Sequence, residues 1–379
     1  MTVAMKEVIK LKFHKDSTLC TKVSGLINSK RQGIYQFLNN DDREMSSLPN
    51  LLKLLEAIEI ENRDEVLDDY FQIIKVNTTF SKQALEYSFM NRLAKRYEML
   101  DRLESLGNRE TKEWCKFYKL IERVGMKGFN EQFDSLRTKN ETLSVLKKIL
   151  HITHLYKIEL FDECADVCCT MEKHLSKVDD ELIQKSYRVR VYRVMSTVAL
   201  FLGRVDECRR MTKNLIDFAS ECSLTKGGAY HQTGMSYLFT SYELGIINYN
   251  KALANYSEEE IVSSDIVSSI NVHNAYWKVK PFGVSADINS AIQDRVANLV
   301  WVNRDYSRAD QLLDSYNEDN LSTRELAFHF YFKSIIHNDF SFLSKSVKAF
   351  RSLGDKFYIN LALKQMRAMG IPEEVVELI

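Results

Sequence analysis

Apolar residues recur along most of this chain at the three- and four-residue spacing that is typical of amphipathic α-helices. After residue 61 the pattern divides into helices of roughly 12 to 20 residues, which short polar segments separate. Strand-like alternation of apolar and polar residues is nearly absent. The pattern therefore predicts an all-α protein.

The first region of the chain has a finer pattern than the rest. Residues 17–60 contain three short helical patterns, with breaks at Gly25, at residues 28–29 and in the polar stretch 39–42. Three short helices with polar corners are typical of a helix-turn-helix domain. We therefore expect a helix-turn-helix head in residues 1–60.

Similar joints between helices recur in the longer region. Residues 160–164 (Leu-Phe-Asp-Glu-Cys) and 204–208 (Arg-Val-Asp-Glu-Cys) are 44 residues apart. Comparable helix starts occur at 242–245, 303–306 and 338–340. The last two are about 35 residues apart, near the period of tetratricopeptide helix pairs. Such pairs bury their apolar faces only by stacking, so we expect a degenerate tetratricopeptide-like superhelix with a concave wall in residues 61–370.

Two segments of the longer region depart from this rhythm. Residues 271–287 include Trp277, Pro281 and Gly283, and they are predicted to form a long ordered loop, with a hinge as the alternative. Residues 371–379 are predicted to form a C-terminal capping helix with Pro in its first turn. Its apolar residues are expected to cap the superhelix and to contribute to a dimer contact: Val375, Val376, Leu378 and Ile379.

Composition agrees with a helical array, and charge singles out the N-terminus. The 379 residues are 45% hydrophobic and include only three prolines and 13 glycines. With 52 basic and 52 acidic residues, net charge predicts no general affinity for nucleic acids or membranes. Residues 1–35 contain seven Lys or Arg against two acidic residues, a local net charge of +5. Any affinity for nucleic acid is therefore expected at the N-terminus.

Cysteine usage and hydropathy predict where the protein resides. The seven cysteines are scattered along helical patterns, so buried, reduced thiols are expected, with a metal or redox site as the alternative. No apolar run approaches the roughly 18 residues of a membrane span, and the N-terminus lacks the apolar core of a signal peptide. We expect a cytoplasmic protein without a membrane partner.

Candidate catalytic and metal-binding residues are few. His151 and His154 share a helix face, but no carboxylate cluster or paired cysteine motif accompanies them. Cys168 and Cys169 near His174 suggest a thiol nucleophile, yet the same residues fit the core of a helical repeat. Phosphate-binding glycine loops are absent. We therefore expect no catalytic site, no metal, no cofactor and no enzymatic activity.

The head has the residue types of a DNA-reading helix. Ile34, Phe37 and Leu38 are predicted to face its core. The candidate DNA-binding residues are Lys22, Asn28, Lys30, Arg31, Gln32 and Tyr35. Arg pairs with guanine, Gln with adenine, and Lys neutralises phosphate. The alternative is a solvated face of a helical repeat. Since one small head contacts only a half-site, DNA binding predicts a homodimer.

Acidic residues are the candidate ligand contacts of the concave wall. Asp294 and Asp355 could bind an arginine-containing peptide, since Arg and carboxylates form strong charge-assisted hydrogen bonds. The alternatives are a surface carboxylate at Asp294 and a helix cap at Asp355.

Several short segments, densest in the last 60 residues or so, follow a familiar order and spacing: 35–39, 81–87, 326–333, 338–339, 345–347, Phe350 and 355–357. Through them the whole chain resembles the peptide-sensing regulators of Gram-positive bacteria and their phages (the RRNPP group). Among these it is most similar to the arbitrium receptors of Bacillus phages.

This resemblance implies a regulator of the lysis-lysogeny decision that binds promoter DNA as a dimer. A short secreted hexapeptide, usually ending in Arg-Gly-Ala, would bind the concave wall and inactivate it. By position, Asp355, Phe357, Gln293 and Asp294 match peptide contacts of the family. Thr197 and Arg324 stand where the family has asparagines, so we expect a different peptide specificity.

Two other functions compete with this one. The chain could be a repeat-scaffold adaptor that sequesters a response regulator or another protein under peptide control, with its N-terminal helices making that contact. An auxiliary enzyme such as a phosphatase is the third possibility. The basic N-terminus and the polar, basic helix of the head favour DNA over protein contact.

Overall fold

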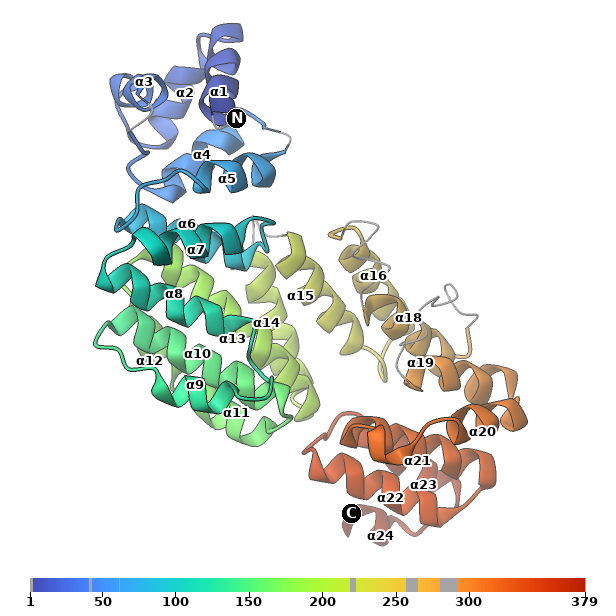
Figure 1. The fold of residues 1–379 in the computed structure, drawn as a ribbon. Helices are drawn as coiled ribbons and strands as arrows, with labels where there is room; N and C mark the ends of the chain where they lie inside the picture. Colours follow the sequence, from blue (N-terminus) through green and yellow to red (C-terminus); the bar gives the residue numbers. More distant parts are fainter. Residues whose placement is uncertain are drawn as a thin grey trace. The chain divides into compact units, whose positions relative to one another are not determined.

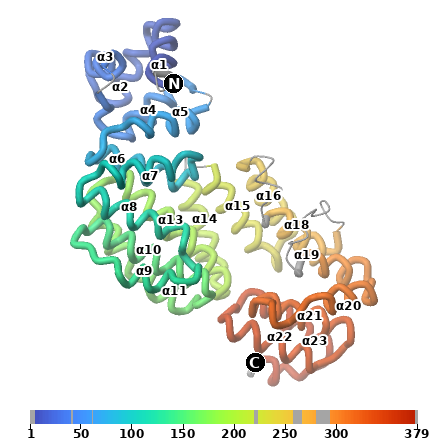
Figure 2. The backbone as a smooth tube through the Cα atoms, viewed as in Figure 1, coloured from blue at the N-terminus to red at the C-terminus, as the bar shows by residue number. Residues whose placement is uncertain are grey.

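The structure is a computed structural model that describes residues 3–40, 43–60, 62–218, 223–256, 265–279 and 292–378. Within these ranges the regular secondary structure is helical and no strand occurs, as Figure 1 and Figure 2 show. This confirms the predicted all-α fold.

The chain forms two compact units, which are described separately. The first unit comprises Met1–Leu150 with Lys173–Arg188, and the second comprises His151–Glu172 with Val189–Ile379. The division falls inside α10 (Glu141–Lys157), α12 (Met171–Leu175) and α13 (Glu181–Phe201). The boundaries predicted after residues 60 and 370 remain predictions.

The first unit begins with five short helices: α1 (Val3–Lys15), α2 (Leu19–Leu26), α3 (Arg31–Asn39), α4 (Leu48–Ala57) and α5 (Arg63–Phe71). Helices α2, α3 and α4 confirm the three that the sequence predicts, and α1 is an addition. Its Met5, Ile9 and Phe13 repeat every four residues and are buried. Ile34 and Phe37 are also buried, which confirms the predicted core face of α3.

A four-residue turn connects α2 to α3, consistent with the predicted head. The chain reverses at Asn28, whose φ of 48° is left-handed, whereas Gly25 lies within α2 and does not break the helix. The Ser29 N–H donates to the Ser24 carbonyl at 3.0 Å, which is the long hydrogen bond of a Schellman ending. Asn occupies this position because it tolerates the left-handed region.

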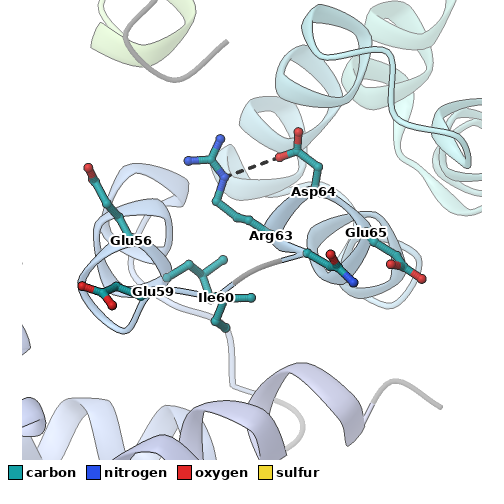
Figure 3. Close-up of a pocket in the computed structure, with 8 residues that line it drawn as sticks. Glu56, Glu59, Ile60, Arg63, Asp64 and Glu65 are labelled. Carbon is teal, nitrogen blue, oxygen red and sulfur yellow. Dashed lines mark hydrogen bonds and ion pairs between the residues drawn. The ribbon is translucent and has the colours of Figure 1, made fainter. Parts of the chain in front are cut away.

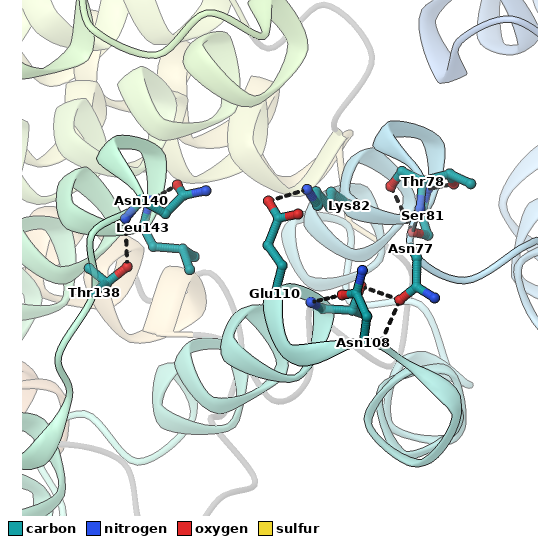
Figure 4. A network of polar contacts seen from close by, with 10 residues as sticks. Asn77, Thr78, Ser81, Lys82, Asn108, Glu110, Thr138, Asn140 and Leu143 are labelled. Carbon is teal, nitrogen blue, oxygen red and sulfur yellow. Dashed lines mark hydrogen bonds and ion pairs between the residues drawn. The ribbon is translucent and has the colours of Figure 1, made fainter.

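The rest of the first unit contains α6 (Thr79–Met90), α7 (Arg96–Leu106), α8 (Arg109–Ile121) and α9 (Phe129–Ser135), together with parts of α10, α12 (Met171–Leu175) and α13. Several of these helices begin at a residue whose side chain caps the helix by accepting a backbone hydrogen bond (Figure 4). Thr78 accepts a hydrogen bond from the Ser81 N–H, and Asn108 accepts one from the Thr111 N–H. Asn77 links the two caps, since its Oδ1 accepts from the Asn108 N–H at 2.6 Å. These polar residues set where each helix starts.

The second unit continues the alternation of helix and short turn. It contains α11 (Phe161–Cys168), α14 (Val205–Phe218), α15 (Ser223–Met235), α16 (Tyr242–Leu253), α18 (Asp265–Tyr276), α19 (Ile292–Ala297), the π-helical turn η1 (Asn298–Asn303), α20 (Tyr306–Asp314), the 3₁₀ turn η2 (Glu318–Asn320), α21 (Thr323–His337), α22 (Phe340–Ser352), α23 (Ile359–Ala368) and α24 (Glu373–Leu378). Helices that are consecutive in the chain pack together, most extensively α21 with α22 and α15 with α16. This is the packing of a helical repeat.

The joints that the sequence identifies are helix starts in the structure. Phe161, Val205, Tyr242, Tyr306 and Phe340 are the first residues of α11, α14, α16, α20 and α22. In four of these joints the residue two positions earlier has a positive φ: Glu159, Gly203, Arg304 and Asn338. A left-handed residue reverses the chain tightly, so the same backbone device recurs where the sequence pattern recurs.

The loop predicted at residues 271–287 is wrong in its first part. Residues 271–276 belong to α18, and Asn271, His273 and Ala275 are buried. Tertiary packing outweighs the weak helix propensity of these polar residues. Pro281 and Gly283 lie outside the described residues.

Most of the described cysteines are buried thiols, as expected: Cys20, Cys115, Cys164, Cys168 and Cys208. Cys169 is exposed, contrary to that expectation, and Cys222 lies outside the described residues. Among the described helices, none combines the length and apolar character that a membrane crossing needs.

Candidate functional sites

The predicted DNA-facing residues gather on one part of the head. All six are exposed: Lys22 on α2, Asn28 and Lys30 in the turn, and Arg31, Gln32 and Tyr35 on α3. Lys30 precedes α3 with an extended backbone, and the first turn of α3 holds no acidic residue. The start of α3 therefore combines basic and polar side chains with the positive end of a helix dipole, which suits contact with phosphate.

A cavity of about 420 Å³ lies in the second unit. Its lining residues come from α15, α16, α18, α21 and the turns after α15 and before α21 and α23: Met235, Leu238, Tyr249, Ser268, Ser269, Val272, Ser322, Arg324, Glu325, Phe328 and Tyr358. Apolar side chains alternate with hydroxyl groups, and two residues are charged. This size and mixture are typical of a site for a small ligand or a short peptide segment.

Most of the polar groups in the cavity wall already have partners within the chain. Glu325 accepts hydrogen bonds from the Ser322 N–H at 2.8 Å and from the Ser322 hydroxyl at 2.7 Å, so its carboxylate caps α21. The Ser269 hydroxyl lies 2.9 Å from His231 Nε2. Burial lowers the pKa of His231 to about 4, which keeps its imidazole neutral near pH 7.

Two carboxylates and an aromatic ring are the nearest groups to Arg324 at the edge of the cavity. Its Nε donates to Glu159 Oε1 at 3.2 Å, and its Nη1 lies 3.3 Å from Asp355 Oδ2. The guanidinium carbon lies 3.8 Å from the centre of the Phe201 ring, a close cation–π contact. The sequence predicts Arg324 and Asp355 as separate peptide contacts, whereas the structure pairs them with each other.

Asp355 is both a cap and a buried ion. It is only 1% exposed, and its Oδ1 accepts hydrogen bonds from the backbone N–H groups of Phe357 and Tyr358. Burial raises the pKa of Asp355 to about 6, although Arg324 and the two N–H donors favour the ionised form. The predicted cap is therefore present together with the ion pair.

Two further predicted contacts lie close to this cluster. Phe357 is buried, packs against Leu238 and lies 4.8 Å from the Phe239 ring, so it supports the cavity wall from behind. The Thr197 hydroxyl lies 3.2 Å from both the Arg193 carbonyl and Gln232 Oε1. A role of either residue in ligand contact stays a prediction.

Asp294 lies within α19, where it is 7% exposed. Burial raises its pKa to about 6, against side-chain hydrogen bonds with Asn271 and Ser268 that lower it. Ser268 lines the cavity, so the carboxylate of Asp294 lies one layer behind the wall. The alternative of a surface carboxylate is wrong for Asp294. The side chain of Gln293 lies outside the described part of the structure.

Sequence reasoning misses five residues of this region: Glu159, Tyr249, Ser268, Ser269 and Tyr358. They come from separate segments of the chain and share no motif, because the fold alone brings them together. Glu159 has the one usable signal, since it directly precedes the recurring joint at residues 160–164.

A second depression, of about 580 Å³, lies between α4 and α5 in the first unit (Figure 3). Its carboxylates do not converge: Glu56, Glu59 and Glu65 point in different directions in Figure 3. Asp64 pairs with Arg63 at 3.5 Å and accepts a hydrogen bond from the Tyr87 hydroxyl. This arrangement provides neither a cation site nor paired catalytic carboxylates.

The candidate thiol nucleophile has the wrong electrostatics for catalysis. A hydrogen bond with Cys164 and burial both raise the pKa of the Cys168 thiol. A thiol nucleophile requires the opposite shift, because only the thiolate attacks. Cys168 therefore acts as a core residue of the repeat.

The C-terminal helix packs onto the second unit. Val376 is 2% exposed and belongs to the apolar core that includes Phe350 and Met366, as expected of a cap. The dimer contact predicted for Val376 is wrong, because packing in this core covers its side chain. Arg367 pairs with Glu373 at 2.6 Å at the start of α24. Val375 is 39% exposed, while the side chain of Leu378 and all of Ile379 lie outside the described structure.

Comparison with known proteins gives a family and relatives that carry the same description. Residues 63–368 match the family described as AimR transcriptional regulator-like. The AimR transcriptional regulator of Bacillus phage SPbeta is 24% identical over 100% of this chain and 98% of its own length. The AimR transcriptional regulator of Bacillus phage phi3T is 23% identical over 98% of this chain and 100% of its own length.

Solved structures show the same fold. The structure described as SeMet-phAimR is similar to this chain with a TM-score of 0.77 and 22% identity, and covers 99% of both chains. The structure described as phAimR-Ligand gives a TM-score of 0.78 with 20% identity, over 87% of this chain and 100% of the other.

Proposed function

Because the chain belongs to the AimR transcriptional regulator-like family, which confirms the resemblance that its sequence indicates, we propose that it is a phage regulator of the lysis-lysogeny decision. It binds promoter DNA as a homodimer and loses this activity when a short secreted peptide occupies the cavity of the second unit. A family of transcriptional regulators is not an enzyme class, which agrees with the expectation that the chain is not an enzyme.

The observation that carries this proposal is the exposed start of α3. Lys30, Arg31 and Gln32 stand together at the N-terminal end of a helix that follows a turn and whose other face is buried. Helix-turn-helix proteins place this part of the second helix in the major groove. Two such heads are needed for a specific site, so dimerisation is part of the proposal.

A short peptide suits the cavity for geometric reasons. The wall offers apolar surface, for example at Val272 and Phe328, and hydroxyl groups, each of which can both donate and accept a hydrogen bond. The wall combines residues of α15 and α18 with residues of α21, so a ligand in it contacts several helices. A ligand regulates only if it binds one spacing of these helices better than another. The Arg-Gly-Ala ending is implied only by the resemblance and is not part of this proposal.

DNA binding is tested by the double substitution Lys30→Ala and Arg31→Ala. Removing two phosphate or base contacts is expected to weaken promoter binding about tenfold or more. Fluorescence anisotropy with the promoter next to the chain's own gene measures this. The matched control is Lys112→Ala with Lys116→Ala on α8, which removes the same charge from another exposed face. Equal losses in the two double variants would refute a DNA-reading head.

Ligand binding is tested by filling the cavity. Val272→Phe adds a ring to the wall and is expected to reduce capture of peptides from a synthetic hexapeptide library by about tenfold. Ile247→Phe, on an exposed position of α16, is the matched control. Mass spectrometry of the retained peptides gives the measurement, and undiminished capture by Val272→Phe would move the ligand elsewhere.

The dimer contact is proposed at the C-terminal helix. Deleting residues 372–379 removes the exposed Val375 and the cap and is expected to shift the mass in light scattering towards the monomer. A persistent dimer would place the interface elsewhere.

The adaptor function has one observation in its favour. Leu11 and Leu26 of the head are 60% and 53% exposed, and such residues are common in protein contacts. If the Lys30 and Arg31 substitutions leave DNA binding intact while Leu26→Ser abolishes regulation in cells, the head contacts a protein.

A further inference from the structure

The three nearest partners of Arg324 together form a binding site for a guanidinium group. Glu159 and Asp355 supply two carboxylates at 3.2 and 3.3 Å, and Phe201 supplies an aromatic face at 3.8 Å. Paired carboxylates and a stacked ring are the groups that bind arginine side chains most strongly in proteins. In this chain the arginine that fills the site comes from the protein itself.

The occupant is fixed in place by the fold. Arg324 lies in the first turn of α21, two residues after Ser322, whose side chain caps that helix. Its side chain is only 17% exposed, and Asp355 is held from the other side by two backbone N–H groups. Both ends of the ion pair are therefore positioned independently of any ligand.

The rest of the described wall provides no second site for a cation. The Glu325 carboxylate accepts hydrogen bonds from Ser322, and the Ser269 hydroxyl lies beside a neutral His231. The remaining lining groups are apolar side chains and hydroxyls. A ligand cation would have to displace Arg324, and the displaced guanidinium would lose both carboxylates and the Phe201 ring.

We propose that Arg324 is a specificity-determining residue, because it occupies a guanidinium subsite that a ligand could otherwise use. The cavity therefore prefers a peptide with an uncharged side chain beside this subsite to a peptide with arginine there. This inference rests on the proposed function, in which a short peptide binds the cavity. Removing Arg324 leaves Glu159, Asp355 and Phe201 free to bind an arginine of the ligand.

The experiment uses two synthetic hexapeptide libraries that are randomised over uncharged residues except at one position. That position is arginine in one library and isotope-labelled citrulline, its uncharged isostere, in the other. The full-length protein selects from an equal mixture, and mass spectrometry gives the ratio of arginine to citrulline peptides retained. The wild type is expected to retain more citrulline peptides. Arg324→Ala is expected to raise the ratio about tenfold, which corresponds to 1.4 kcal/mol.

Two further variants make the result decisive. Arg324→Gln keeps more of the side chain and so disturbs the packing less than Arg324→Ala. It replaces Arg324→Ala if circular dichroism shows that the alanine variant does not fold. Arg324→Ala combined with Asp355→Asn removes a carboxylate of the subsite and is expected to return the ratio towards that of the wild type.

The possible outcomes separate the two proposals. Peptides retained with the same ratio by the wild type and both Arg324 variants would overturn the inference and leave the proposed function standing. A wild type that prefers arginine peptides would also overturn it. If neither the wild type nor any variant retains more peptide than the support material without protein, the proposed function itself fails, and the inference fails with it.

Discussion

The head and the cavity use the same kind of side chain in opposite ways. Arg31 at the start of α3 is exposed, whereas the side chain of Arg324 is 17% exposed and has two carboxylates and an aromatic ring around it. An exposed arginine keeps its hydration and is available to a phosphate. A buried arginine has exchanged its hydration for partners in the fold, so it affects stability and excludes competitors.

The carboxylates differ in the same way. Asp16 in the head accepts hydrogen bonds from Thr18, which lower its pKa. Burial raises the pKa of Asp294 and of Asp355 to about 6. Ionisation therefore favours folding at Asp16 and opposes it at the two buried positions. Four stability measurements test this contrast, from the largest expected effect to the smallest.

Arg324→Ala should have the largest effect. It leaves Asp355 buried without its cation and is expected to lower the free energy of unfolding by about 3 kcal/mol at about pH 8. The loss should shrink below about pH 6, where Asp355 becomes protonated. Urea unfolding at about pH 8 and below about pH 6 measures both losses. Lys356→Ala, an exposed neighbour, is the control, and an equal loss there would contradict the buried-pair argument.

Asp294→Asn should have an effect of opposite sign. The pKa of Asp294 in the folded state lies above the 3.8 of the unfolded chain, so the stability of the wild type falls as pH rises from about 4 through 6. Asn removes the buried charge and is expected to raise the free energy of unfolding by about 2 kcal/mol near neutral pH. Thermal melts across this range provide the test.

The control for this substitution comes from the head. Asp16→Asn removes an exposed carboxylate whose lowered pKa favours folding, so it should not stabilise the protein at any pH. A gain in stability there would show that the pH dependence does not arise from burial.

Ser47→Ala should cause a smaller loss in the head. The Ser47 hydroxyl accepts a hydrogen bond from the Asn50 N–H at the start of α4, and its removal is expected to cost about 1 kcal/mol. Ser47→Asp keeps an acceptor at this position and should retain the stability of the wild type. If both variants lose equally in urea unfolding, the cap does not stabilise α4.

Lys30→Ala with Arg31→Ala should have the smallest effect on stability, within about 0.5 kcal/mol, because both side chains are exposed. Their effect should instead appear in DNA binding, where the slope of log K against log salt is expected to fall by about 2. Anisotropy titrations at several salt concentrations measure that slope. If the slope stayed unchanged and the stability fell, Lys30 and Arg31 would serve folding and not DNA binding, which would contradict the contrast between head and cavity.

Local sequence pattern determined the elements of this protein. The period of apolar residues predicts helices because it reflects the geometry of a single helix, and the recurring joints predict the starts of α11, α14, α16, α20 and α22. The core face of α3 follows from the same periodicity. The reversal between α2 and α3 is only partly predictable, since Gly25 is a plausible break and Asn28 is the actual one.

Only the tertiary structure decided which charges meet. Nothing in the sequence around Glu159, Arg324 or Asp355 indicates that they pair, because they are far apart in the chain and belong to different helix pairs. The sequence does contain an acidic residue after the turn at Gly354, for which a cap is the alternative to a peptide contact, and the structure shows the cap. Whether that carboxylate awaits a ligand or already holds an arginine of the same chain depends on packing, which brings α21 and the joint before α11 to the same place.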